Sequence, residues 1–240
     1  GVENRGKVWY SLAGRSSLYS QKGEPLTLLP PLQESSQQCD LSAISPVKVA
    51  AARQESEEHY FAISDQIRSI LSISGYTKVA VGASGGIDSA VTAALFCSIL
   101  SPENVLLINM PSRYNSEKTK ELAKRLADRL CCWYSEIPIE NSCELTQREL
   151  KQFPIQLGQH QEFLSLTPFQ NESVQARDRG SRLLAAFSAA FDALFSCNSN
   201  KTELTVGYST LYGDLAGFFA PLGDLWKHQV YALGRYLNES

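Results

Sequence analysis

Residues 84–89, with the sequence S-G-G-I-D-S, constrain the fold of this chain more than any other segment. They follow a short apolar run at 79–83, which predicts a buried strand, and precede an Ala- and Leu-rich stretch at 90–100, which favours a helix. A strand that turns directly into a helix presents unpaired backbone N–H groups at the positive end of the helix dipole. The segment therefore predicts a site for phosphate groups.

The glycines and the polar residues of this segment all suit a phosphate site. Gly85 and Gly86 let the backbone approach an anion closely. The hydroxyls of Ser84 and Ser89 can donate further hydrogen bonds, and Asp88 can hold a divalent cation that bridges to phosphate. Because no Lys precedes the last Ser, the segment is not a Walker A loop. A plainer interpretation stays open, in which the segment is only a tight turn whose Asp88 and Ser89 cap the helix.

The S-G-G-x-D-S pattern resembles the pyrophosphate loop (PP-loop) of the ATP pyrophosphatase superfamily. Enzymes of that superfamily activate a carboxylate or carbonyl oxygen with AMP and release pyrophosphate. The resemblance implies that the segment binds ATP and that Asp88 helps to hold Mg²⁺.

Composition narrows the class of protein further. A chain of 240 residues with 43% hydrophobic residues can form one α/β domain of normal core size plus a smaller piece. A net charge of −3 gives no general attraction for a polyanion, so we expect no nucleic-acid partner. The three histidines are far apart in sequence, which disfavours a zinc site.

Cysteine usage and hydropathy indicate the compartment. The six cysteines show no C-x-x-C spacing, and they are typical of reduced thiols in a cytoplasmic protein. No run of about 18 apolar residues exists, and the first residues resemble no signal peptide, so we expect no membrane partner. The chain begins with Gly1 rather than Met, which suggests a piece of a longer polypeptide.

The order of apolar periods predicts an α/β fold. Residues 1–45 contain short β-like runs separated by turn residues, and 34–45 are rich in Ser, Gln and Asp, which is typical of a linker. Beyond them, alternating strands and helices predict a doubly wound parallel sheet with ligands at the carboxyl ends of its strands. The predicted elements are helices at 52–74, 117–131, 141–152 and 172–195, strands at 105–110 and 133–137, and a surface loop at 153–171.

A second series of motifs follows in a fixed order. The chain carries M-P-S-R-Y, E-S-V-Q-A-R-D-R-G, S-N-K-T-E-L-T-V-G-Y-S-T-L-Y-G-D and P-L-G-D-L-W-K. In this order, residues 46–240 resemble the synthetase domain of glutamine-dependent NAD synthetase. Residues 1–45 resemble, more weakly, the last strands of a nitrilase-like amidohydrolase, which is the kind of glutaminase domain that precedes the synthetase domain in that family.

The resemblance implies a fold of the adenine-nucleotide α-hydrolase type and a carbon–nitrogen ligase of NAD biosynthesis. The expected reaction is ATP-dependent amidation of deamido-NAD to NAD through an acyl-adenylate, with release of AMP and pyrophosphate. Ammonia would come from glutamine through the nitrilase-like domain, which makes the whole protein a glutamine amidotransferase. We also expect a homo-oligomer, because members of the family assemble through this domain.

The resemblance also assigns roles to individual positions. The catalytic residues are expected to be Asp88, Lys227 and Glu203, and the Mg²⁺ ligands Asp88 and Glu203. Deamido-NAD would contact Arg177, Glu203 and Asp214. The residues expected at the ATP are Gly82, Ser84, Gly85, Gly86, Asp88, Ser89, Asn198 and Lys227.

Three departures from the family pattern affect these expectations. Ser173 replaces the usual Asn after Glu172, and Asn198 replaces the usual Thr of T-[GS]-N-K-[ST]-E. The K-P-[ST]-A-x-L segment of the family lies beyond Ser240, so we expect an incomplete active site in this chain. Two alternatives therefore stay open: another amidator of the superfamily, of the GMP-synthetase or tRNA-modifying type, and a nucleotide-binding fragment without turnover.

Overall fold

The computed structural model describes residues 2–5, 8–11, 13–32, 34–42, 45–47, 54–113 and 117–239. Contacts between Cα atoms divide the chain into two compact units, Gly1–Ser74 and Gly75–Ser240. The domain boundary expected near residue 46 was set by sequence resemblance rather than by contacts, and it stays a prediction. Over the described residues, no helix is both long enough and apolar enough to span a membrane.

The described part of the first unit contains two antiparallel strand pairs and one helix. The β-rich segment expected near the N-terminus is present, and the helix begins at Glu55 within the predicted range. Three glutamates in its first turn complement the helix dipole, which stabilises this end of the helix. The elements are β1 (Val2–Arg5), β2 (Val8–Ser11), β3 (Ser17–Tyr19), β4 (Pro25–Leu28) and α1 (Glu55–Ser74).

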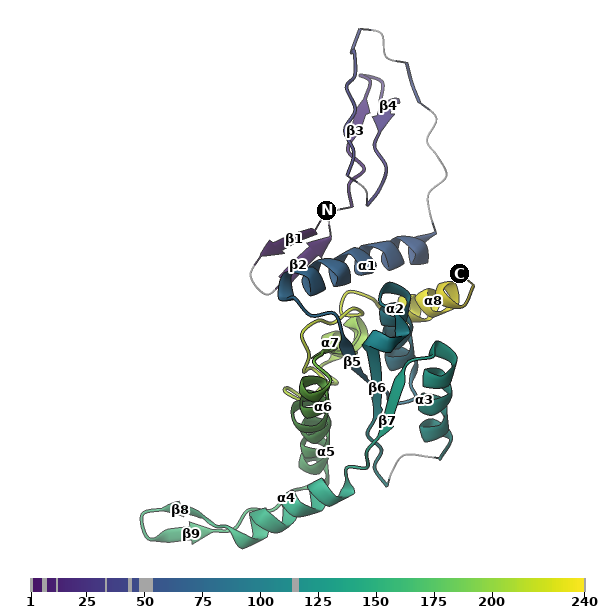
Figure 1. Ribbon diagram of the computed structural model, residues 1–240. Coiled ribbons are helices and arrows are strands. Elements are labelled where there is room, and N and C mark those ends of the chain that lie inside the picture. Colours follow the sequence, from purple (N-terminus) through teal and green to yellow (C-terminus); the bar gives the residue numbers. More distant parts are fainter. Residues whose placement is uncertain are drawn as a thin grey trace. The chain divides into compact units, whose positions relative to one another are not determined.

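The second unit is the α/β domain (Figure 1). Its strands and helices alternate along most of the chain, as the sequence predicts. In chain order its elements are β5 (Val79–Gly82), α2 (Ile87–Ile99), η1 (Pro102–Asn104), β6 (Val105–Asn109), α3 (Glu117–Leu130), β7 (Trp133–Glu136), α4 (Glu140–Gln152), β8 (Ile155–Leu157), β9 (His160–Glu162), α5 (Pro168–Arg177), η2 (Asp178–Leu184), α6 (Ala185–Ala190), β10 (Leu194–Phe195), α7 (Lys201–Val206) and α8 (Lys227–Glu239).

A parallel sheet forms the centre of this unit. Among the described residues it has the strand order β10-β5-β6-β7, with every neighbouring pair parallel. Every residue of β6 is buried, as expected for a parallel strand with helices on both sides. The chain passes from β5 to β6 on one side of β5, and β10 later pairs with the other side of β5. This reversal places a crevice at the carboxyl ends of β5 and β10, where α/β sheets bind ligands.

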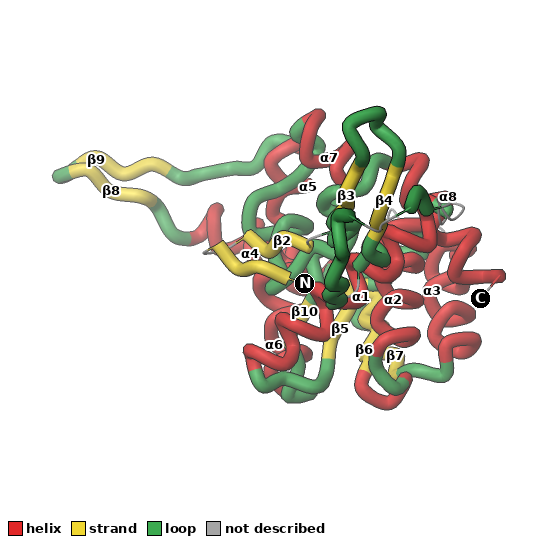
Figure 2. The backbone as a smooth tube through the Cα atoms, turned by 90° about the horizontal axis from the view of Figure 1, so that it is seen from above, coloured by secondary structure: helices red, strands yellow, loops and turns green. Residues whose placement is uncertain are grey.

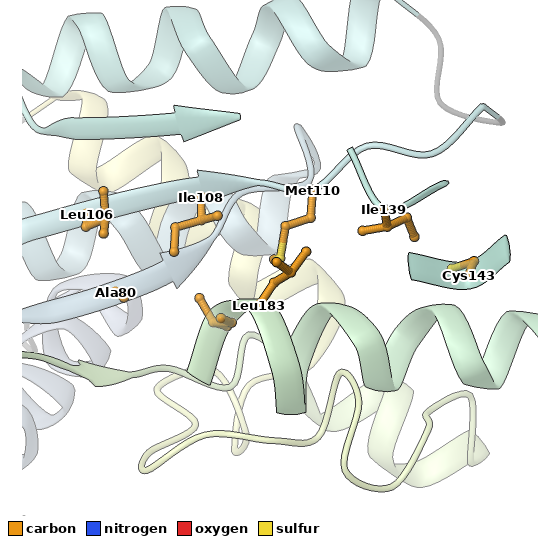
Figure 3. Close-up of a cluster of buried hydrophobic side chains, with 8 residues drawn as sticks. Ala80, Leu106, Ile108, Met110, Ile139, Cys143 and Leu183 are labelled. Atoms are coloured by element: carbon orange, nitrogen blue, oxygen red, sulfur yellow. The ribbon is translucent and has the colours of Figure 1, made fainter. Parts of the chain in front are cut away.

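Alternation along the strands supplies both faces of the core. Ala80, Leu106, Ile108 and Met110 lie on one face and pack in a cluster that includes Leu183 of η2 (Figure 3). Helices α2 and α3 contact the sheet through β5, β6 and β7. The predicted α/β fold with a doubly wound parallel sheet is therefore confirmed.

The helix expected at 172–195 is wrong at both ends. It begins earlier, at Pro168, because Thr167 and Gln170 form a capping box in which each side chain accepts a bond from the other residue's backbone N–H. The helical path continues as a π-helix, η2, and ends at Ala190. Asp192 then takes a left-handed conformation with φ 57°, which turns the chain so that Leu194 pairs with Val79 of β5.

The surface loop expected at 153–171 is also partly wrong. Strands β8 and β9 form an antiparallel hairpin there, in which Leu157 pairs with His160. The turn between them uses Gly158 at φ 61°, a conformation that glycine adopts without steric cost. Figures 1 and 2 show this hairpin projecting from α4, away from the sheet of its own unit.

The buried centre of β6 generates a stability prediction. Leu107 is fully buried, so Leu107→Ala removes apolar contacts and leaves a cavity. We expect the free energy of unfolding to fall by about 3 kcal/mol, measured by chemical denaturation. Leu122→Ala on α3 is the control, since this side chain is 39% exposed and its loss should cost less than about 1 kcal/mol. Equal losses in the two variants would contradict the placement of β6 at the core.

Candidate functional site

A cavity of about 710 Å³ opens at the carboxyl ends of the central strands. Its walls come from the ends of β5 and β6, from the segment after β10 and from η2. This is the position that the reversal of strand order predicts for a ligand. Of the residues expected in the site, the cavity is lined by Gly82, Ser84, Asp88, Ser89, Asn198, Glu203 and Asp214, whereas Gly85, Gly86, Arg177 and Lys227 do not line it.

The S-G-G-I-D-S segment forms the turn from β5 into α2. Ser84 Oγ lies 3.2 Å from Ser89 Oγ and accepts a hydrogen bond from Gly86 N at 3.3 Å. Gly86 is the N-cap of α2, and as a glycine it has no side chain with which to cap this end of the helix. The N–H groups at the start of α2 are therefore left to a ligand, as an anion site requires.

Gly85 is required by both conformation and space. Its φ of 79° is left-handed, and a Cβ at this position would lie 2.4 Å from the backbone oxygen of Thr119. No residue with a side chain fits this space without moving the backbone. The start of α3 therefore holds the turn in shape.

Asp88, in the first turn of α2, is the centre of a polar cluster. Lys227 Nζ makes a short ion pair with Asp88 Oδ2 and lies 3.8 Å from Glu203 Oε1. Asn200 Nδ2 donates to Asp88 Oδ1 at 2.9 Å. Three segments that are remote in sequence thus meet at one carboxylate.

The charge of Lys227 is secured by its partners. Burial by itself would lower the pKa of Lys227, but the hydrogen bond to Asp88 and the negative charges of Asp88 and Glu203 outweigh it and raise the pKa. A raised lysine pKa contributes stability at all pH values below the ordinary value of about 10.4, and this is lost only as the pH rises further. The ammonium group is therefore fully charged at neutral pH.

The start of α7 organises this cluster. Asn200 is the N-cap, and its Oδ1 accepts from Thr202 N at 2.9 Å and from Glu203 N at 3.2 Å. Glu203 Oε2 accepts from Asn200 N at 3.2 Å, which completes a capping box. Thr202 Oγ1 accepts from the backbone N of Lys227 at 3.0 Å, so the same turn also positions Lys227.

Asn198 joins the two strands beside the cavity. Its Nδ2 donates to the carbonyl of Gly82 at 2.8 Å, and its Oδ1 accepts from Ser196 Oγ at 2.9 Å. Asp214 lies in the loop after α7, where its Oδ1 accepts from Thr210 N at 2.9 Å. Both polar atoms of the Asn198 side chain are therefore bonded within the protein, whereas the second carboxylate oxygen of Asp214 is left for other partners.

The two arginines of Q-A-R-D-R differ in their placement. Arg177 is exposed, and its Nε donates to the carbonyl of Leu211 at 3.2 Å. Arg179 lines the cavity, and its Nε donates to the carbonyl of Met110 at 2.9 Å. Desolvation lowers the pKa of Arg179, but arginine stays charged at any physiological pH. The π-helical path of η2 lies at this point, and π-helices are frequent at functional sites.

Two residues of the site were missed by sequence reasoning. Asn200 and Arg179 both belong to motifs that the sequence shows, yet neither was assigned a role. The capping role of Asn200 was readable, because an Asn followed three residues later by Glu is a signature of a helix start. Its bond to Asp88 was not, since 112 residues separate the two.

The residues present fit both ATP and Mg²⁺. Asp88 and Glu203 converge on one cation, the Lys227 ammonium group, so their oxygens are placed where a metal ion could take its position. Mg²⁺ is usually held by one or two carboxylates together with substrate phosphates. Among the described residues, no group of three His, Cys, Asp or Glu side chains could hold a metal by itself. A metal here would therefore depend on the phosphates bound by the turn at Ser84.

Comparison with known proteins identifies a family and several relatives that this chain resembles. The profile of the NAD synthase family matches residues 59–239. The glutamine-dependent NAD(+) synthetase of Aquifex aeolicus is 39% identical over 186 residues, which are 77% of this chain and 31% of that protein. The chain spans between 30% and 40% of the length of the first curated relatives that it matches.

Two solved structures are similar over most of the chain. The glutamine-dependent NAD+ synthetase of Acinetobacter baumannii, in complex with ADP, has a TM-score of 0.77 and 32% identity over 92% of this chain and 41% of that chain. The NH3-dependent NAD synthetase of Campylobacter jejuni has a TM-score of 0.67 and 33% identity over 78% of this chain and 75% of that chain. The second protein is similar to this chain over most of its own length.

The close approach at Gly85 can be tested separately from its unusual φ. Gly85→Ala should lower the free energy of unfolding by about 2 kcal/mol or more, because it adds a clash to the conformational strain. Gly158→Ala has a similar positive φ but no atom within 4 Å, so it should cost only about 1 kcal/mol. Chemical denaturation of both variants measures the difference. A Gly85→Ala variant as stable as Gly158→Ala would show that Thr119 does not confine the turn.

Proposed function

The chain belongs to the NAD synthase family, and we propose that the protein it forms part of makes NAD from deamido-NAD, ATP and ammonia. The observation that carries the proposal is the meeting of Asp88, Glu203 and Lys227 beside an uncapped helix N-terminus. This arrangement supplies what the reaction needs: a cradle for phosphates, two carboxylates for Mg²⁺ and one fixed positive charge. Membership of the family supports deamido-NAD as the substrate, and the geometry of the site supports its activation by ATP.

The first step activates a poor electrophile. A carboxylate resists attack by ammonia because it is anionic and has no good leaving group. In the proposed step, an oxygen of the nicotinate carboxylate attacks the α-phosphorus of ATP. The bond from that phosphorus to the bridging oxygen breaks, and pyrophosphate leaves with the electron pair. The product is an acyl-adenylate.

The turn at 84–89 stabilises the departing pyrophosphate. N–H groups at the start of α2 and the hydroxyl of Ser84 can donate to its oxygens as their negative charge grows, whereas the Ser89 hydroxyl already donates to the carbonyl of Gly86 at 3.0 Å. Lys227 can neutralise part of this charge, because its pKa is raised and it stays protonated. Mg²⁺, when held by Asp88 and Glu203, would supply further charge neutralisation on the phosphate oxygens.

The second step needs little help from acidic or basic side chains. The nitrogen of ammonia attacks the acyl carbon of the adenylate, the nitrogen loses a proton, and AMP leaves. The amide product is NAD. In this scheme Arg177 and Asp214 contribute to binding of the dinucleotide, as the family resemblance implies.

We propose that ammonia reaches this site from glutamine, through a nitrilase-like glutaminase domain of the same protein. The glutamine-dependent relatives support this source, and residues 1–45 carry the weak nitrilase-like pattern. We further propose that the protein works in the cytoplasm as a homo-oligomer. The ammonia-dependent relative from Campylobacter jejuni suggests that ammonia alone supports the second step.

An exchange assay tests the first step without any nitrogen source. The intact protein is incubated with Mg²⁺, ATP, deamido-NAD and labelled pyrophosphate, and the label that enters ATP is measured. We expect exchange that depends on deamido-NAD, with the Asp88→Ala variant as the inactive control. Added ammonia should then yield NAD, AMP and pyrophosphate in equal amounts. Absence of exchange and of NAD would contradict the proposal.

The same assay separates the alternative acids. Xanthylate in place of deamido-NAD tests for an amidator of the GMP-synthetase type. Nicotinate mononucleotide tests for another acid substrate. This acid is suggested by the NMN synthetase structure of Francisella tularensis, which has 25% identity and a TM-score of 0.68. We expect deamido-NAD to give the highest kcat/KM of the three acids. A higher value for either of the others would reassign the substrate.

Lys227 can be tested by variants that change charge and shape independently. Lys227→Met keeps the length of the side chain but removes its charge, so the exchange rate should fall by roughly 100-fold or more. Lys227→Arg keeps the charge in a different geometry and should recover part of the rate. Exchange by the Met variant within about threefold of the parent rate would show that Lys227 does not stabilise the transition state.

A further inference from the structure

We propose that Asn200 is a positioning residue that fixes the orientation of the Asp88 carboxylate. This inference deepens the proposed function, because it explains how Asp88 is prepared to share a metal ion with ATP. Nothing in the sequence assigns Asn200 this role. Its basis is the hydrogen bond from Asn200 Nδ2 to Asp88 Oδ1 at 2.9 Å.

Asn200 is itself held rigidly. Its side chain is fully buried, with 0% relative exposure. Its Oδ1 accepts two backbone N–H groups of α7, at 2.9 and 3.2 Å, and these bonds fix which end of the amide is the oxygen. The Nδ2 group is therefore forced toward Asp88. A buried amide whose two ends are both bonded cannot rotate without leaving polar atoms unpaired.

The two oxygens of Asp88 have different partners. Oδ1 is occupied by Asn200, and Oδ2 faces Lys227. Oδ2, which faces Lys227, can exchange the ammonium group for a metal ion, while Oδ1 stays bonded to Asn200. Loss of a group that holds a ligating carboxylate in this way typically lowers metal affinity or activity by roughly 10- to 100-fold.

The turn that contains Asn200 also aligns the other two members of the cluster. Glu203 closes the capping box on Asn200, and Thr202 accepts from the backbone N of Lys227. Movement of Asn200 would therefore change the relative positions of both carboxylates. A simple helix cap satisfies the N–H groups of its own helix, whereas this one also reaches a residue on α2.

Two substitutions separate positioning from capping. Ser and Asp are both good N-cap residues, so Asn200→Ser and Asn200→Asp should still begin α7 at residue 200. The Ser side chain is too short to cap α7 and reach Asp88 at the same time. The Asp side chain has the shape of Asn but cannot donate, and it replaces attraction by repulsion between two carboxylates.

The first readout does not depend on the reaction. Crystal structures of the intact protein and of its Asn200→Ser variant, both without ligand, show the orientation of the Asp88 carboxylate. We expect α7 to be unchanged and the carboxylate to be rotated in the variant. An unrotated carboxylate would overturn the proposal, whether or not the protein makes NAD.

The second readout is metal binding in the presence of a non-hydrolysable ATP analogue. Electron paramagnetic resonance of free Mn²⁺ gives its dissociation constant, which we expect to rise roughly tenfold or more in Asn200→Ser. In the exchange assay, both variants should lose kcat while KM for deamido-NAD changes little, because the acid does not contact Asn200. Parental Mn²⁺ affinity and parental kcat in these variants would show that Asn200 is only a cap.

Discussion

The carboxylate of Asp88 is the point on which the geometry of the site depends. It accepts from Asn200, 112 residues later in the chain, and pairs with Lys227, 139 residues later. These bonds join the turn after β5, the start of α7 and the start of α8. Helix α2 also packs directly on α8, and the cluster joins the start of α7 to this pair. The Asp88 side chain is 18% exposed, so its charge loses part of its hydration, and two partners offset that loss.

The sheet explains why these segments come together at this place. The chain reverses direction across the sheet between β5 and β10, and Asn198 bridges the two strands through the carbonyl of Gly82. The opening that results is lined by polar residues from every neighbouring strand end. Glycines at 180 and 213 allow the opposite wall to close, since a Cβ at Gly180 would lie 2.3 Å from the Gly213 oxygen. The cavity is thus a consequence of topology, and the two glycines allow one of its walls to pack closely.

Much of this architecture could be predicted from the sequence, because it follows from local patterns. Apolar runs such as 105–109 identify buried strands, and the S-G-G-I-D-S turn marks the strand end at which the cavity opens. The end of the helix at 172–195 could not be predicted in this way. The residues after Ala190 are apolar enough to continue a helix, and only pairing of Leu194 with β5 makes them a strand. The roles of Asn200 and Arg179 were missed for a related reason: both depend on partners far away in the chain.

We propose that Asp88 and Glu203 exchange the Lys227 ammonium group for a metal ion when ATP binds. A crystal structure of the intact protein with Mn²⁺ and a non-hydrolysable ATP analogue tests it directly, because Mn²⁺ is located by its anomalous scattering. We expect a manganese peak in coordination contact with both carboxylates, with Lys227 moved onto a phosphate and Asn200 still bonded to Asp88. A metal ion bound to the phosphates without either carboxylate, while Lys227 stays on Asp88, would contradict it.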